Sequence, residues 1–173
     1  KVIRRYGLKM FERYNQIFAK LPLAVMTWNK IFAVHGGVPE GLENIADING
    51  IGDMLDPDDR VVFQLLWNDP IEKDGWFFKN FRGSYSQRFG REAFAHFMQK
   101  HDIKLFVRAH EVQKDGYKAY FNAQLISLDS STTPRGKDAM KLFIVEPSGE
   151  YRVVSVQDFE HLPFNKIFGT MDT

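Results

Sequence analysis

The sequence predicts a mixed α+β fold in one domain that covers residues 1–173. Two observations lead to this prediction. Some stretches repeat apolar side chains every three or four residues, as helices do, whereas others are short apolar runs bounded by turn residues, as strands are. With 173 residues and 44% hydrophobic side chains, the chain can bury one sizeable core and is too short for two domains of ordinary size.

The first elements expected are a helix and a hairpin. Apolar side chains recur at helical spacing over residues 2–19, and Pro22 would end the helix. Its apolar stripe predicts that this helix faces the core. Two apolar runs at 23–28 and 30–34 then predict a hairpin that delivers His35 to its far edge.

The middle of the chain is predicted to be helical and then irregular. Asp56 and Pro57 form a start signal for a helix that runs through Leu66. Residues 67–92 mix aromatic, glycine and charged residues without a clear period. We therefore expect a long functional loop there.

The second half is predicted to begin with a helix and to continue as strands. The helix spans 91–102, and the strand at 104–107 leads directly into the sequence Arg-Ala-His-Glu. The helix is expected to bury Ala93, Phe94, Phe97 and Met98. Four further strands are expected to form a meander, at 116–121, 124–129, 140–146 and 150–156.

Two of the predicted strands end in a histidine, one in His35 and the other in His110. Strands that end at the same edge of a sheet would direct both imidazoles to one point. Imidazole nitrogens on two rigid strand ends suit Mn, Fe or Zn. The alternative for His35 is a packed, hydrogen-bonded side chain beside the tight turn that Gly36 and Gly37 indicate.

Composition narrows the choice of partners and mechanisms. The 23 basic and 22 acidic residues leave a formal charge of +1, which gives no reason to expect a nucleic acid or a membrane as partner. Absence of cysteine excludes a disulfide scaffold, thiolate-bound zinc and a cysteine nucleophile. No apolar run approaches the roughly 20 residues of a membrane span, and a cytoplasmic location is expected.

An ordered series of short motifs resembles the PPP family of serine/threonine protein phosphatases. The match covers roughly residues 1–146 and looks like the C-terminal half of that catalytic domain. The motifs are VHGG at 34–37, LLWNDP at 65–70, FRG at 81–83, FG at 89–90, RAHE at 108–111, DGY at 115–117 and QLISL at 124–128. The resemblance implies part of a four-layer α/β/β/α metallophosphoesterase sandwich.

The resemblance also implies a reaction and roles for individual residues. In such enzymes a hydroxide that bridges two divalent metal ions (Mn, Fe or Zn) attacks the phosphorus of phosphoserine or phosphothreonine in a protein substrate. His35 and His110 match ligands of one metal, and Arg82 matches an arginine that binds the phosphate of the substrate. Asp69 is expected near the metals, where it orients a water or a ligand histidine; alternatively it stabilises the turn at Pro70.

Three motifs that the family places before HGG, namely GDxHG, GDxVDRG and GNHE, do not occur in the sequence. The chain is therefore expected to supply ligands to only one of the two metals, and to supply only part of that metal's ligand set. Negligible turnover is expected without the N-terminal half of the catalytic domain, which becomes an expected partner. A regulatory protein is a further candidate partner.

A second departure lies at 127–136, where SLDSSTTPRG stands in place of the family's FSAPNYCG. The family tyrosine is lost, and one hypothesis is that Arg135 supplies a replacement phosphate contact. The alternative is a solvated loop arginine.

Two other functions compete with the protein phosphatase. A metallophosphoesterase that hydrolyses nucleotides shares HGG-like strand ends, but RAHE and LLWNDP argue against it. A catalytically inactive binding or regulatory module would explain the absent motifs. Against that module, such a protein has no physical need to keep His35, His110 and Arg82.

Overall fold

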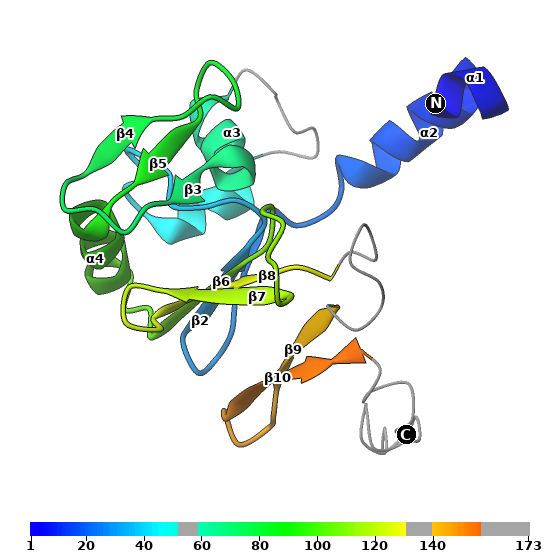
Figure 1. The fold of residues 1–173 in the computed structure, drawn as a ribbon. Coiled ribbons are helices and arrows are strands. Elements are labelled where there is room, and N and C mark those ends of the chain that lie inside the picture. The colour runs from blue at the N-terminus through cyan, green and yellow to red at the C-terminus, as the bar shows by residue number, and fades with distance from the viewer. Residues whose placement is uncertain (52–58, 131–139, 157–173) are drawn as a thin grey trace.

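The computed structural model describes residues 1–51, 59–130 and 140–156 of the chain. Its architecture is mixed α+β, as predicted, and contains a five-stranded, a three-stranded and a two-stranded sheet (Figure 1). None of the helices in these ranges is long and apolar enough to cross a membrane.

The five-stranded sheet contains the predicted hairpin and the strand that precedes His110. Its order is β1-β2-β6-β8-β7. The central strands β2, β6 and β8 are parallel, and the two edge strands pair antiparallel with their neighbours. The bounds are Ala24–Met26 for β1, Ile31–Val34 for β2, Leu105–Arg108 for β6, Tyr117–Tyr120 for β7 and Leu125–Leu128 for β8.

Helices cover one face of this sheet. The helix α4 (Arg91–Lys100) buries the four apolar residues expected of it, and two of them, Phe94 and Phe97, pack on Phe106 of β6. The helix α3 (Arg60–Trp67) begins where the Asp59 carboxylate accepts hydrogen bonds from two backbone N–H groups. The expected start at residues 56–57 lies outside the described residues. A short 3₁₀ helix, η1, spans Ile45–Gly50.

The segment predicted to be a long loop forms a second sheet, so that prediction is wrong. Its strands are β3 (Asp69–Pro70), β4 (Phe77–Lys79) and β5 (Gln87–Phe89), in the order β3-β5-β4. Each strand has only two or three residues. Strands this short do not show an alternating pattern in the sequence, which is why periodicity missed them.

The N-terminal helix is broken, and it does not face the core. Gly7, with φ of 82°, separates α1 (Val2–Tyr6) from α2 (Leu8–Phe18), and neither helix has a buried residue. Side chains of the predicted stripe are largely exposed, for example Ile17 at 59%. Figure 1 shows both helices projecting from the rest of the chain. Periodicity identified the residues that share a helix face, but it cannot say whether anything covers that face.

The last two strands form a separate hairpin, so the predicted four-stranded meander is wrong. Strands β9 (Lys141–Val145) and β10 (Tyr151–Ser155) pair only with each other. Because β8 already pairs with β6 on one side and β7 on the other, it has no free edge for β9. The hairpin instead packs its apolar side chains on the second face of the large sheet, where Ile31, Leu105, Val107 and Ile126 are buried.

The glycine pair after β2 allows this strand end to lie directly against the end of α3. The backbone N–H of Gly36 donates to the carbonyl of Leu65 at 2.7 Å. A Cβ atom on Gly36 would lie 2.6 Å from the backbone nitrogen of Trp67. The close approach therefore requires glycine at this position.

We predict that Gly36→Ala lowers the free energy of unfolding by about 1–3 kcal/mol, because backbone atoms must shift to accept the methyl group. Urea denaturation measures this quantity. Gly50→Ala is the matched control, since a Cβ atom there meets nothing within 4 Å. Equal stability of the two variants would contradict the packing described for Gly36.

Candidate metal and phosphate site

The two histidines predicted at strand ends lie side by side. Strands β2 and β6 are parallel neighbours, so both end at the same edge of the sheet. The Nε2 atom of His35 is 3.1 Å from the Nδ1 atom of His110. The backbone also joins the two strand ends, since the Ala109 N–H donates to the His35 carbonyl at 3.1 Å. The expected convergence of the two imidazoles is therefore observed.

His110 has an unusual backbone conformation, with φ of 68°. Few residues other than glycine adopt this left-handed region, and those that do often occur at functional sites. The conformation falls immediately after β6, where the chain leaves the sheet edge. It is part of the turn that brings the imidazole toward His35.

Burial and a nearby positive charge keep both imidazoles neutral. Burial lowers the pKa of His35, and the charge of Arg108 lowers it further. The same two causes lower the pKa of His110 to about 4. A neutral imidazole has the lone pair that a metal ion needs, so at neutral pH both rings are in the form that ligates metals.

The histidine pair fits a divalent cation but supplies few ligands. The Nε2 atom of His110 is buried and has no hydrogen-bond partner within the described residues. The two nitrogens that face each other, His35 Nε2 and His110 Nδ1, belong to neutral imidazoles, which are ligands that suit a metal such as Zn or Mn. However, no group of three or more His, Asp or Glu side chains that would hold a metal occurs in the described ranges. Protein metal sites ordinarily have three or four protein ligands, so this donor set is partial.

Asp69, at the start of β3, lies between two arginines. Its carboxylate accepts a hydrogen bond from Arg82 Nε at 2.5 Å, from Asn80 Nδ2 at 3.0 Å and from Arg108 Nη2 at 3.1 Å. Burial alone would raise the pKa of Asp69, but these hydrogen bonds and charges lower it overall. Asp69 is therefore an ionised carboxylate whose contacts are mainly with the two arginines.

Arg82 is placed to bind an anion. Its Nε atom donates to Asp69, and the side chain is 37% exposed. The guanidinium makes no other hydrogen bond or ion pair within the described residues. Because a guanidinium carries five donors in a planar fork, the remaining donors can bind paired oxygens such as those of a phosphate.

Arg108, the first residue of the RAHE motif, was given no role among the candidate site residues predicted from the sequence. Its side chain is fully buried and contacts both neighbouring carboxylates, Asp69 and Glu111. A buried guanidinium is stable only when paired and hydrogen-bonded, and here all three nitrogens donate. The acceptors are Gly36 O, Asn68 O, Asp69 Oδ1, Glu111 Oε2 and Ser127 Oγ. Its position two residues before His110 was the sequence feature that could have identified it as part of the site.

One predicted residue cannot be placed. Arg135, the hypothetical replacement phosphate contact, lies outside the described residues. The structure therefore brings His35 and His110 together, pairs Arg82 with Asp69, and leaves the hypothesis for Arg135 as it was.

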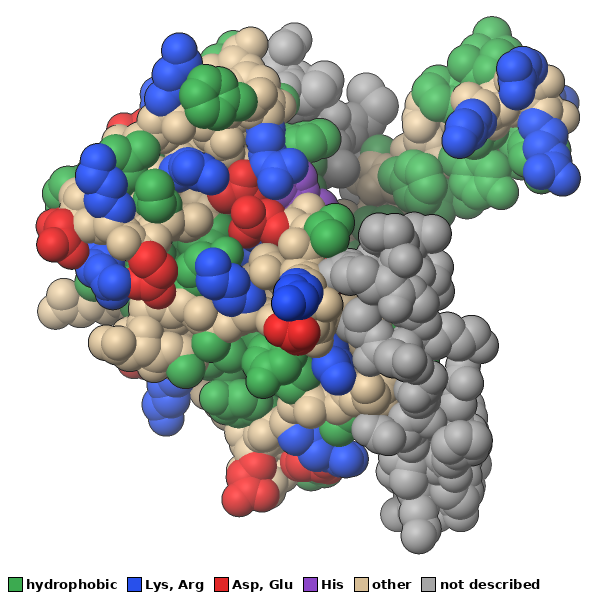
Figure 2. Space-filling view, in the orientation of Figure 1, with side chains coloured by type: hydrophobic (Ala, Val, Ile, Leu, Met, Phe, Trp, Pro, Cys, Tyr) green, Lys and Arg blue, Asp and Glu red, His purple; other side chains and the backbone are tan. Residues whose placement is uncertain are grey.

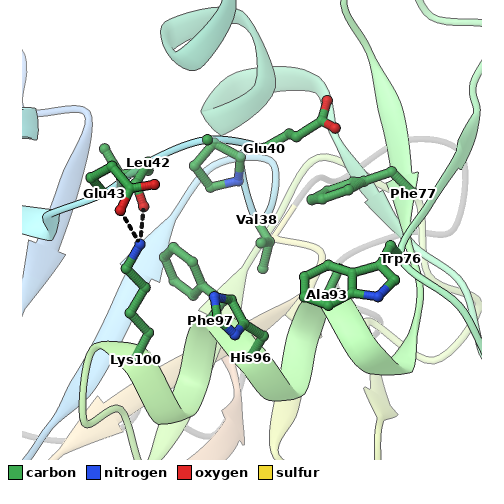
Figure 3. A pocket seen from close by; sticks show the side chains of 12 residues that line it. Val38, Glu40, Leu42, Glu43, Trp76, Phe77, Ala93, His96, Phe97 and Lys100 are labelled. Carbon is green, nitrogen blue, oxygen red and sulfur yellow. Dashed lines mark hydrogen bonds and ion pairs between the residues drawn. The ribbon is translucent and has the colours of Figure 1, made fainter.

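A separate cavity of about 310 Å³ lies between α4 and residues 38–43 (Figure 3). Its walls are mostly apolar, and Trp76 lies against His96 at its edge. Lys100, the lysine among its lining residues, is paired with Glu43. None of the four residues proposed for metal or phosphate lines this cavity, so it is distinct from the histidine site.

Comparison with known proteins identifies the class of protein. The model of the calcineurin-like phosphoesterase family matches residues 1–114, and the chain belongs to this family. The expectation of a metallophosphoesterase from the sequence motifs is thereby confirmed. Calcineurin-like phosphoesterases use divalent metals, which agrees with the neutral histidine pair.

A solved structure with a similar fold is a protein serine/threonine phosphatase from Saccharomyces cerevisiae, described as similar to the human phosphatase PP5. The sequence identity is 24% and the TM-score is 0.74. The match covers 88% of this chain and 52% of the yeast protein, so the chain spans about half the length of that phosphatase. The expected metallophosphoesterase fold is confirmed.

We predict that Asp69→Asn lowers the free energy of unfolding at pH 7 by about 1.5–3 kcal/mol, because charged hydrogen bonds are lost. The folded-state pKa of Asp69 is depressed. Its contribution is therefore fully present above the unfolded value of about 3.9 and disappears as the pH falls through the folded value. Urea denaturation across this pH range should show the parent and the variant converging in acid. Glu146→Gln, which alters an exposed ion pair with Arg152, serves as control and should change stability little.

Proposed function

We propose that this chain contributes to a metal-dependent phosphatase that hydrolyses phosphoserine and phosphothreonine in proteins. The observation that carries the proposal is a pair of neutral imidazoles at the ends of two parallel strands, with His35 Nε2 and His110 Nδ1 3.1 Å apart. Family membership and the fold shared with the yeast protein serine/threonine phosphatase support it. The pairing of Arg82 with Asp69 supports it further, because phosphate hydrolysis needs both a cation site and an anion-binding group.

In this proposal His35 and His110 hold one of two divalent ions, which are Mn, Fe or Zn. Such a cation, when bound, supplies positive charge near phosphoryl oxygens and makes a water molecule more acidic. Burial around the two imidazoles keeps them unprotonated and competent to bind it. The partial donor set leads us to propose that residues 1–173 alone bind metal weakly, and that the remaining ligands come from the N-terminal half of a phosphatase domain.

Arg82 orients the substrate in this proposal. Its free guanidinium donors bind oxygens of the phosphate, while its Nε remains on Asp69. Asp69 acts on the substrate through Arg82, because it fixes one edge of the guanidinium and leaves the other edge for the anion. Arg108 in turn fixes Asp69 from the protein interior.

The second candidate is a non-catalytic binding module of phosphatase ancestry. The observation in its favour is the shortage of metal ligands among the described residues. The two candidates differ in metal affinity and in turnover, which the following two experiments measure.

We predict that replacing either histidine, by His35→Ala or His110→Ala, weakens binding of Mn²⁺ or Zn²⁺ to the chain at least tenfold. Even residues that only orient a ligand typically change affinity 10- to 100-fold, and a ligand itself contributes more. Isothermal titration calorimetry measures the affinity. His96→Ala is the matched control, since His96 lies on α4 beside Trp76 and should not affect the metal. Unchanged affinity in both histidine variants would refute the proposed metal site.

We predict that Arg82→Ala, in the full-length protein, lowers kcat/KM for a phosphoserine peptide by about 10²–10³, as loss of a group that stabilises developing charge does. Lys104→Ala, an exposed lysine before β6, is the control. Residues 1–173 assayed alone with Mn²⁺ should show negligible hydrolysis. A rate comparable to that of complete phosphatases from this polypeptide alone would contradict the ligand count.

A further inference from the structure

The small sheet β3-β5-β4 and its flanking residues carry more basic side chains than Arg82, the one that the candidate site uses. Residues 75–91 contain four basic residues and no acidic residue. In Figure 2, Lys and Arg side chains are spread over the part of the surface that these strands form. The basic residues are Lys79, Arg82, Arg88 and Arg91.

Three cations on or beside this sheet have no ion pair within the described residues: Lys73, Arg88 and Lys79. Lys79 follows Phe78 along β4 and therefore projects from the opposite face of the sheet from Phe78 and Arg88. Arg91 pairs with Glu72 and Asp74, which accounts for the acidic residues on either side of Lys73. Arg88 and Lys73 are exposed, and neither has an ion pair within the described residues. Their charges therefore remain available to a ligand.

These two cations and Arg82 follow one line across the sheet. Asp69, which holds Arg82, is the register partner of Arg88 on β5. Arg88 is in turn the register partner of Phe78 on β4, and the Lys73 ammonium lies 4.5 Å from the centre of the Phe78 ring. Register partners project from the same face of a sheet, and neighbouring strands are about 4.8 Å apart. The line therefore extends about 10 Å from Asp69.

We propose that Arg88 and Lys73 bind acidic side chains that flank the phosphorylated residue of a protein substrate. This inference rests on the proposed function, in which Arg82 binds the phosphate. An extended peptide advances about 3.3 Å per residue, so acidic side chains within about three positions of the phosphoresidue can reach Arg88 or Lys73. Charge complementarity of this kind contributes mainly to specificity and to the rate of association.

A partner with many phosphates fits the observations less well. Binding of nucleic acid depends on many contacts with Lys and Arg, whereas Lys73 and Arg88 are the only unpaired cations that the described part of the chain places on this face of the sheet. The formal charge of the chain is +1, so no broad positive field supports such binding.

The test compares two fluorescein-labelled phosphoserine peptides that differ only in having aspartate or asparagine on both sides of the phosphoserine. Fluorescence anisotropy with the full-length protein gives both dissociation constants. We expect the acidic peptide to bind the parent protein more tightly than the neutral peptide. In the double variant Lys73→Gln/Arg88→Gln, the affinity for the acidic peptide should fall about three- to tenfold, which is the effect of losing two exposed charge pairs. The affinity for the neutral peptide should fall less than twofold in the same variant.

Lys9→Gln/Lys104→Gln removes the same total charge from exposed positions on α2 and before β6, and it should leave both affinities unchanged. Circular dichroism verifies that each variant is folded. Equal binding of both peptides to the parent protein would overturn the inference, and so would unchanged selectivity in the Lys73/Arg88 variant. Displacement of the acidic peptide by RNA at lower concentrations would assign the surface to nucleic acid instead. Hydrolysis of the phosphoserine peptide by the parent protein tests the proposed function separately, because the binding comparison does not require turnover.

Discussion

The buried guanidinium of Arg108 joins the segments that form the histidine site. It donates to the carbonyl of Gly36 after β2, to Asn68 and Asp69 at the start of β3, and to Glu111 after β6. A charge with no exposed surface is tolerated only when its donors and its charge are matched, and these contacts match both. Any displacement of one strand end would therefore leave a buried donor or carboxylate unpaired. This requirement fixes the strand ends that carry His35 and His110.

The same guanidinium affects the chemistry of the groups around it. Together with burial it lowers the pKa of both histidines, and it helps to keep Asp69 ionised. Asp69 then holds Arg82, whose side chain is partly exposed. A single buried charge thus favours neutral imidazoles on one side and an oriented arginine on the other. This arrangement accounts for how a site with few ligands retains a defined geometry.

Much of the fold and of the candidate site could be predicted because the signals were local. The strands before His35 and His110, and the four apolar residues buried by α4, follow from short apolar runs and helical spacing. The predictions that failed concerned relations between segments. The stripe on residues 2–19 is exposed, the three strands within 67–92 are too short to show a period, and β9 is separated from β8 because β8 has no free edge. The network of Arg108 was not predicted either, since its acceptors are up to 72 residues away.

The sequence by itself determined the family, through its motifs, and supplied the candidate site residues: two histidines at strand ends, an arginine and an aspartate. It did so because side-chain type and local period are properties of a few adjacent residues. Only the tertiary structure decided that β2 and β6 are parallel neighbours, that the imidazoles meet, and that Asp69 lies between Arg82 and Arg108. Those facts depend on strand order and on the pairing of buried charges, which arise only when distant segments pack together.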